Sequence, residues 1–411
     1  MSKARLHFLF LNVGHFLDHL VMLVFATVAA LVLRSEWNMA YAELIAYATP
    51  GFVAFGIFSL PAGWLADRWS REGMMAVFFF GIGLSAIACS FARTPTEMAV
   101  GLFFVGMFAA IYHPVGLTLV VDGAKRTGMA LAFNGIWGNL GVGGAALLTG
   151  LMIDSTGWRS AFMFPGMVSL GLGLGYLALM WHEVVHMPGQ RRAARKAAPK
   201  SKKASSLLPE DNRDLFLRIT IIVLYTTGVS ALVFQSVTFA LPKIFEERLT
   251  GIAETATMIG WATFLVAAAS SVTQLAVGHL LDSIGPRTIF LIVSGVQVVC
   301  FTLMPGLTGW WALLVSLFFV MGSFGQLPIN DYIIGKTATP ESRASIYGAR
   351  FVLTFTILAI SLPLIGWIHA NWGFDTLFRI LAMTSASVFV VASLLPNKVP
   401  EPALQSPAPA E

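Results

Sequence analysis

Long runs of apolar residues, separated by short polar breaks, follow one another along almost the whole chain. Each run is close to the roughly 20 residues that a helix needs to cross the hydrocarbon core of a membrane. The runs predict twelve helices, over residues 6–33, 41–66, 74–92, 96–121, 128–153, 159–182, 216–242, 256–281, 288–307, 310–335, 344–369 and 374–395. The pattern therefore predicts an all-α membrane protein with twelve transmembrane helices.

A polar stretch at 183–215 divides these helices into two sets of six. It is rich in Ala, Lys, Arg, Ser and Pro, which is typical of a flexible linker whose basic residues touch anionic lipid head groups. We expect an N-terminal six-helix bundle over 1–182 and a C-terminal six-helix bundle over 216–395. The Pro- and Ala-rich tail at 396–411 is expected to be disordered.

Short motifs recur in the second half at a nearly constant distance. The sequence GWLAD at 63–67 is matched by GHLLD at 278–282, and FFV at 103–105 is matched by FFV at 318–320, both 215 residues later. Parallel repeats of this kind flank a substrate site at their interface in secondary transporters. We therefore expect two pseudo-symmetric bundles that make one complete site, and a monomer.

Composition excludes the common soluble classes. Hydrophobic residues make up 56% and charged residues 11% of the chain, against about 25% charged in soluble domains. The net charge of +5 is concentrated in the linker, so no nucleic-acid partner is expected. Two cysteines exclude a disulfide framework. The distribution of Lys and Arg places both termini in the cytoplasm of a cell (inner) membrane protein.

The polar residues after the second predicted helix carry a known motif. Residues 63–71 read Gly-x-Leu-x-Asp-Arg-x-x-Arg, and the second half repeats Gly278, Asp282 and Arg287. This loop resembles the signature loop of the major facilitator superfamily. The resemblance implies the major facilitator fold, with transport by alternating access.

A narrower resemblance rests on His15 and Asp18 in the first predicted helix, His113-Pro114 in the fourth, and the Gly-rich run at 128–141. These residues are similar to the fosmidomycin-resistance type of efflux protein. The resemblance implies export of a small molecule in exchange for protons.

The loop motif has a mechanical interpretation. Gly63 allows close backbone approach, and Asp67 can cap the following helix. Arg68 and Arg71 can pair with Asp67 and with Asp122 at the end of the fourth helix, which would latch one conformation of a rocking transporter. The counterparts would be Gly278, Asp282 and Arg287. The alternative is that these basic residues only retain the loops inside.

The first predicted helix carries the polar and ionisable residues whose burial in a membrane costs the most free energy. Asn12, His15, Asp18 and His19 share one face, and Asp18 lies roughly 18 Å below the start of the helix. An ionisable group at that depth usually faces a cavity, and beside imidazoles it can exchange protons near neutral pH. His113 in the fourth predicted helix is expected at about the same depth as His15. The alternative is a structural hydrogen-bond cluster.

The second half offers weaker candidates. Asp331 and Arg350 lie at similar depths in neighbouring predicted helices, so they can form a pair that substrate or protons break; a static pair is the alternative. Gln326 and Asn330 are further cavity candidates. Together, the His and Arg side chains favour an anionic or polar organic substrate.

One motif points to a different class. His182, Glu183 and His186 form H-E-x-x-H, which on a helix places two zinc ligands and a general base on one face. The sequence Met-Pro-Gly at 187–189 ends the helix at once and no third ligand follows, so a polar helix end is favoured over a membrane metalloprotease. No cofactor or metal is expected.

These observations predict a secondary transporter rather than an enzyme. Its partners would be a small organic solute, protons and membrane lipid, and it would act as a proton-coupled antiporter for efflux. A proton-symport importer and a transport-dead sensor with the same fold are the alternatives.

Overall fold

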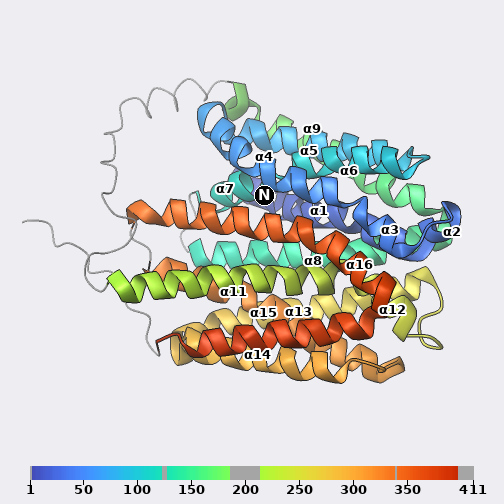
Figure 1. Cartoon of the computed structure of the whole chain (residues 1–411). Helices are drawn as coiled ribbons and strands as arrows, with labels where there is room; N and C mark the ends of the chain where they lie inside the picture. The colour runs from blue at the N-terminus through green and yellow to red at the C-terminus, as the bar shows by residue number, and fades with distance from the viewer. Residues whose placement is uncertain (1, 123–126, 186–212, 338–339, 397–411) are drawn as a thin grey trace, which may run out of the picture.

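The computed structural model describes residues 2–122, 127–185, 213–337 and 340–396. Within these ranges all regular secondary structure is helical, and the helices lie side by side along one direction (Figure 1). We call residues 2–185 the first half and residues 213–396 the second half. The prediction of an all-α membrane fold is confirmed.

The first half contains α1 (Lys3–Val28), η1 (Ala29–Leu33), α2 (Arg34–Glu36), α3 (Tyr41–Ala46), α4 (Thr49–Arg68), α5 (Arg71–Ser90), α6 (Pro95–Ala109), η2 (Tyr112–Gly116), α7 (Leu117–Val121), α8 (Thr127–Ser155) and α9 (Trp158–Val185). The second half contains α11 (Arg213–Phe239), α12 (Leu241–Arg248), α13 (Ala256–Ile284), α14 (Pro286–Leu303), α15 (Gly309–Thr337) and α16 (Pro340–Ser393). In Figure 1, α4, α5, α6 and α9 gather on one side of the molecule and α12 to α15 on the other.

Eleven helical stretches in the described residues are long and apolar enough to cross a membrane. The last of them, Val352–Ser393, has 42 residues, which is twice the length that one crossing needs. Gly373 interrupts it with a φ of 71°, a backbone conformation that favours glycine. This stretch therefore supplies the two predicted helices at 344–369 and 374–395.

The seventh predicted helix is shorter than its apolar run. α11 ends at Phe239, and the separate short helix α12 begins at Leu241. Pro242 occupies the first turn of α12, and because proline has no N–H it cannot extend the hydrogen-bond ladder of α11. The turn carries Lys243, Glu246 and Glu247 into the region described below.

Helices α8 and α13 join the two halves through small residues. A Cβ added at Gly150 would lie 2.2 Å from the carbonyl oxygen of Ala256, and one at Gly260 would lie 2.7 Å from that of Ala146. Such close backbone approach is the usual way helices pack in lipid. The contact continues to mid-helix, where the Asn139 amide donates to Gln274 at 2.5 Å.

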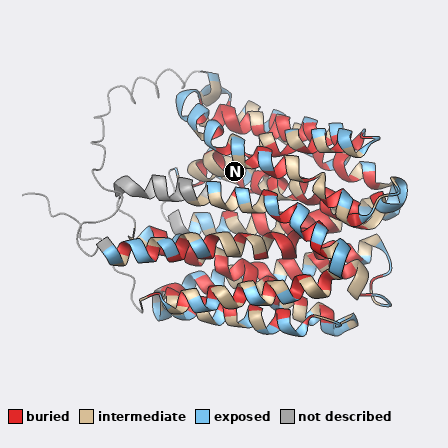
Figure 2. Ribbon diagram, in the orientation of Figure 1, coloured by how far each residue is buried: buried red, intermediate tan, exposed pale blue. Residues whose placement is uncertain are grey.

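Buried residues line the faces that helices turn toward one another, and exposed ones outline the molecule (Figure 2). Many of the exposed side chains are large and apolar, including Leu84, Ile221, Ile292 and Trp310. In a membrane protein such side chains face the lipid tails, so the outer surface agrees with the predicted spans.

Candidate functional site

Four titratable side chains meet where α1 passes η2. The ring centroids of His15 and His19 lie 5.0 Å apart, and those of His113 lie 5.4 Å and 5.6 Å from them. A carboxylate oxygen of Asp18 lies 3.6 Å from Nε2 of His113. The structure thus brings His113 to the ionisable residues of the first helix, as expected, and we call these four residues the His–Asp cluster.

The π-helix η2 places His113. It contains Pro114, and π-helical turns within α-helices are often found at functional positions. Its first residue, Tyr112, stacks on the ring of His15 at 4.7 Å. A Cβ at Gly63 would lie 3.2 Å from Cβ of Pro114, so the motif glycine lets α4 approach η2 closely.

A hydrogen-bond chain fixes the ring of His15. Its Nδ1–H donates to the backbone carbonyl of Asn134 at 2.9 Å. The Asn134 amide donates to Asn12 at 3.0 Å and to the Tyr112 hydroxyl at 2.9 Å, and that hydroxyl donates to the carbonyl of Leu11. Asn12 therefore supports the cluster rather than facing a cavity. Tyr112 and Asn134 were not predicted.

The His–Asp cluster has a covered end and an accessible end. Asp18 is 1% exposed, and neither of its oxygens has a hydrogen-bond partner among the described residues. The side chain of His113 is 19% exposed. Its ring meets Phe55, whose ring lies 4.7 Å from that of Phe355 in the second half. His113 thus stands between a buried carboxylate and the boundary between the halves.

Imidazole nitrogens of His15, His19 and His113 lie within 4.8 Å of one another. Zinc bonds of about 2.0–2.1 Å would hold such nitrogens roughly 3.4 Å apart in tetrahedral geometry. The rings would have to close in before they could share one ion, and we assign no metal to them.

The predicted pair in the second half is present. Arg350 of α16 donates to the carboxylate of Asp331 on α15. Gln326 and Asn330 are buried and hydrogen-bonded within the second half: the Gln326 amide donates to Gln297 at 2.5 Å, and Asn330 accepts from Thr226 at 2.9 Å. These two amides therefore do not line a space open to solute in this structure.

The latch residues divide into two kinds. Arg71 donates to Asp67 and to Asp122, both at 3.0 Å. Arg68 lies over the ring of Trp64 at 3.6 Å rather than on a carboxylate, because the aromatic face offers its guanidinium a cation–π contact. The prediction that Arg68 pairs with an acid is therefore wrong.

Two further expectations about this loop differ from the structure. Ser70, not Asp67, caps α5 by accepting from the backbone N–H of Gly73. A Cβ at Gly278 would meet nothing within 4 Å, so the packing reason for Gly63 does not apply to its repeat. Arg287 is the second residue of α14, and the side chain of Asp282 lies outside the described residues.

The H-E-x-x-H motif is only partly described. Nζ of Lys3 donates to both oxygens of Glu183, at 2.7 Å and 2.9 Å. His182 is in the last turn of α9, and His186 lies outside the described residues. Glu183 thus ties the end of α9 to the start of α1.

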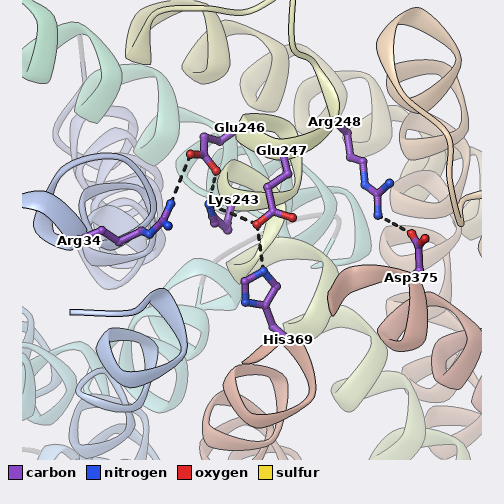
Figure 3. Close-up of polar contacts among 7 residues, drawn as sticks. All are labelled: Arg34, Lys243, Glu246, Glu247, Arg248, His369 and Asp375. Carbon is purple, nitrogen blue, oxygen red and sulfur yellow. Dashed lines mark hydrogen bonds and ion pairs between the residues drawn. The ribbon is translucent and has the colours of Figure 1, made fainter. Parts of the chain in front are cut away.

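A network of charged residues that the sequence did not single out lies around α12 (Figure 3). Lys243, 2% exposed, donates to Glu246 and pairs with Glu247 at 3.2 Å. Arg34 reaches Glu246 at 3.5 Å from the first half. Nε2 of His369 lies 2.9 Å from Glu247. We call these five residues the α12 network.

Two neighbours extend this arrangement. Tyr41 of α3 meets the ring of His369 edge-on at 5.5 Å, and Arg248 donates to Asp375 beside it (Figure 3). Burial works to raise the pKa of Glu247, but the hydrogen bond with His369 and the charge of Lys243 hold that pKa below the usual value of glutamate. Glu247 is therefore held in its ionised form, and the Arg34–Glu246 pair joins the α12 network to the first half.

Comparison with known proteins decides the family. The family model of the Major Facilitator Superfamily matches residues 11–256 and 223–411. The chain belongs to the Major Facilitator Superfamily. This is a superfamily of transporters, so the chain is a multi-pass membrane transporter and not an enzyme, and the metalloprotease alternative falls.

Individual relatives match in part. The gallate transporter of Pseudomonas putida is 29% identical over 43% of this chain and 38% of its own length. The methylenomycin A resistance protein of Streptomyces coelicolor is 27% identical over 36% of this chain and 31% of its own length. The matched region thus spans less than half of either relative.

A solved structure supports the fold over nearly the whole chain. A POT family transporter in complex with 5-aminolevulinic acid superimposes with a TM-score of 0.71, at 12% identity, covering 94% of each chain. At that identity the likeness concerns the fold alone.

Proposed function

We propose that this superfamily member is a proton-coupled secondary transporter that exports a small organic solute by alternating access. The observation that carries the proposal is the contact of the buried Asp18 with His113, the cluster member that lies next to the boundary between the halves. A carboxylate buried without a partner is costly, whereas one that gains or loses a proton beside an imidazole can link its charge to a conformational change.

In this proposal the proton reaches Asp18 through His113, the accessible member of the pair. Protonation of Asp18 removes the buried charge. When Asp18 loses the proton again, its carboxylate must be stabilised by an imidazolium or by a hydrogen-bond donor of the substrate. The hydrogen bond from His15 to Asn134 supports this role, because it fixes the proton on Nδ1 and leaves the buried Nε2 free to accept one.

We assign the α12 network to the outer gate. Contacts between the halves run from Gly150 and Ala256, at one end of α8 and α13, to Asn139 and Gln274 at mid-helix. These contacts close the end of the molecule at which the α12 network lies. The excess of Lys and Arg at the other end supports a cytoplasmic position for that other end and an extracellular position for the closed one. The structure then corresponds to an inward-facing state, and opening outward separates Arg34 from Glu246.

Import of an organic anion with protons is the second candidate. Three imidazoles within one cluster would become more attractive to an anion as they gain protons, which favours binding solute and proton together. The likeness to a gallate transporter supports this candidate, whereas the likeness to a resistance protein supports export.

Reconstituted vesicles distinguish the two. The purified chain in proteoliposomes is given inward or outward pH gradients and a panel of organic acids and antibiotics, and solute uptake is followed. Export by exchange predicts that solute accumulates on the side from which protons leave. Accumulation of solute on the side that protons enter would show symport, and would favour the second candidate over export. Solute movement unaffected by either gradient would overturn proton coupling.

A further inference from the structure

A hollow lies on the outer surface, away from the His–Asp cluster. It encloses about 450 Å³ between α11 and α16 and is lined by Asp214, Leu217, Arg218, Ile221, Ile222, Tyr225, Val391 and Leu394. The α11 residues recur at helical spacing along one face. Leu217, Ile221 and Leu394 are each more than 45% exposed, so the hollow, which we call the α11–α16 groove, opens toward lipid.

One end of this groove carries opposite charges. Asp214 begins the membrane span of α11, and Arg218 follows one turn later. Nη2 of Arg218 donates to the carbonyl of Leu394 at 2.8 Å, which holds the side chain over the groove. A guanidinium has five N–H donors, so this bond leaves donors for a phosphate.

The remainder of the groove is apolar. Tyr225 closes its far end, with its hydroxyl donating to Ser387 at 2.7 Å. The rise from Asp214 to Tyr225 is about 16 Å along the helix. This length accommodates most of an acyl chain, and the charged pair stands at the membrane surface where a lipid head group lies.

We propose that the α11–α16 groove binds one phosphatidylethanolamine molecule. Arg218 holds the phosphate, Asp214 accepts hydrogen bonds from the primary ammonium, and an acyl chain lies along Ile221 toward Tyr225. The charge pattern selects the lipid. Phosphatidylglycerol brings no ammonium for Asp214, and the quaternary ammonium of phosphatidylcholine has no N–H to donate.

The full chain, purified in detergent and supplied with equal amounts of the three lipids, tests this by native mass spectrometry. The wild type is expected to retain one phosphatidylethanolamine in preference to the others. Arg218→Gln should weaken retention about tenfold, because a charge-assisted contact is lost. Asp214→Asn should remove the preference over phosphatidylglycerol while keeping lipid binding.

A matched pair of variants separates groove binding from general lipid adherence. Ile221→Trp fills the groove, whereas Ile292→Trp changes a similarly exposed lipid-facing residue on α14. Loss of the retained lipid only in Ile221→Trp supports the proposal. Equal retention of all three lipids by the wild type, or equal behaviour of the two Trp variants in folded protein, would overturn it.

Discussion

At the scale of single residues, the chemistry concentrates where a polar side chain interrupts an apolar helix. Asp18, His15, His19 and His113 were predictable because ionisable groups deep in a span are rare and costly. Tyr112 was not, since an aromatic residue in a span usually packs against other helices. Its hydroxyl bonds depend on a π-helical turn that spacing alone does not reveal.

A glycine substitution tests the placement of His15. A Cβ at Gly138 would lie 2.6 Å from Nε2 of His15, so Gly138→Ala should displace the ring and lower solute transport by about tenfold or more. Gly171→Ala, where a Cβ meets nothing within 4 Å, is the matched control. The check is the transport rate of each variant in proteoliposomes. Unchanged transport in Gly138→Ala would show that the position of His15 does not matter for transport.

At the scale of elements, the helices and most of their ends followed from hydrophobic run lengths. The short helix α12 did not, because its apolar start is continuous with the run that forms α11. The α12 network was missed for the same reason. Its members Arg34, Lys243 and His369 come from three separate segments. The sequence shows that these residues are ionisable, but it does not show that they lie close together in the fold.

The packing of α8 on α13 is sensitive to side-chain size. Gly150→Ala would place a methyl group against the backbone of Ala256, and overpacking of this kind costs about 1–3 kcal/mol. We expect a lower thermal unfolding temperature than in Gly171→Ala, measured by tryptophan fluorescence in detergent. If both variants unfold at the wild-type temperature, the close contact does not hold the halves together.

The ionised state of Glu247 predicts a pH dependence of stability. Because its pKa is lower in the folded chain than the usual value, its contribution is fully present above that usual value and is lost as the pH falls through the lowered one. The loss of stability on acidification should be smaller in Glu247→Gln than in the wild type. Thermal unfolding of both proteins, from neutral pH down to values below the usual pKa of glutamate, checks this. Parallel curves over that whole range would contradict it.

At the scale of the whole molecule, the repeat and the loop motif were sufficient to predict the fold. They did not reveal how tightly one end of the boundary between the halves is closed, since that depends on glycine contacts and on the Arg34–Glu246 pair. In our proposal this pair holds the inward-facing state.

Arg34→Gln removes that ion pair, and we expect it to shift the population toward the outward-facing state. Distances between spin labels on α2 and α12 should broaden to longer values, whereas Arg93→Gln, outside the α12 network, should leave them unchanged. If Arg34→Gln gives the same distance distribution as the wild type, the Arg34–Glu246 pair does not hold the outer gate closed.

In our proposal, Asp18 couples proton movement to transport. The most direct measurement is the pH change inside proteoliposomes when solute is added, compared between wild type, Asp18→Asn and the control His7→Gln, whose ring contacts the Tyr176 hydroxyl outside the His–Asp cluster. We expect solute-dependent proton flux in wild type and control, and none in Asp18→Asn protein that inserts normally. Undiminished flux in Asp18→Asn would contradict it.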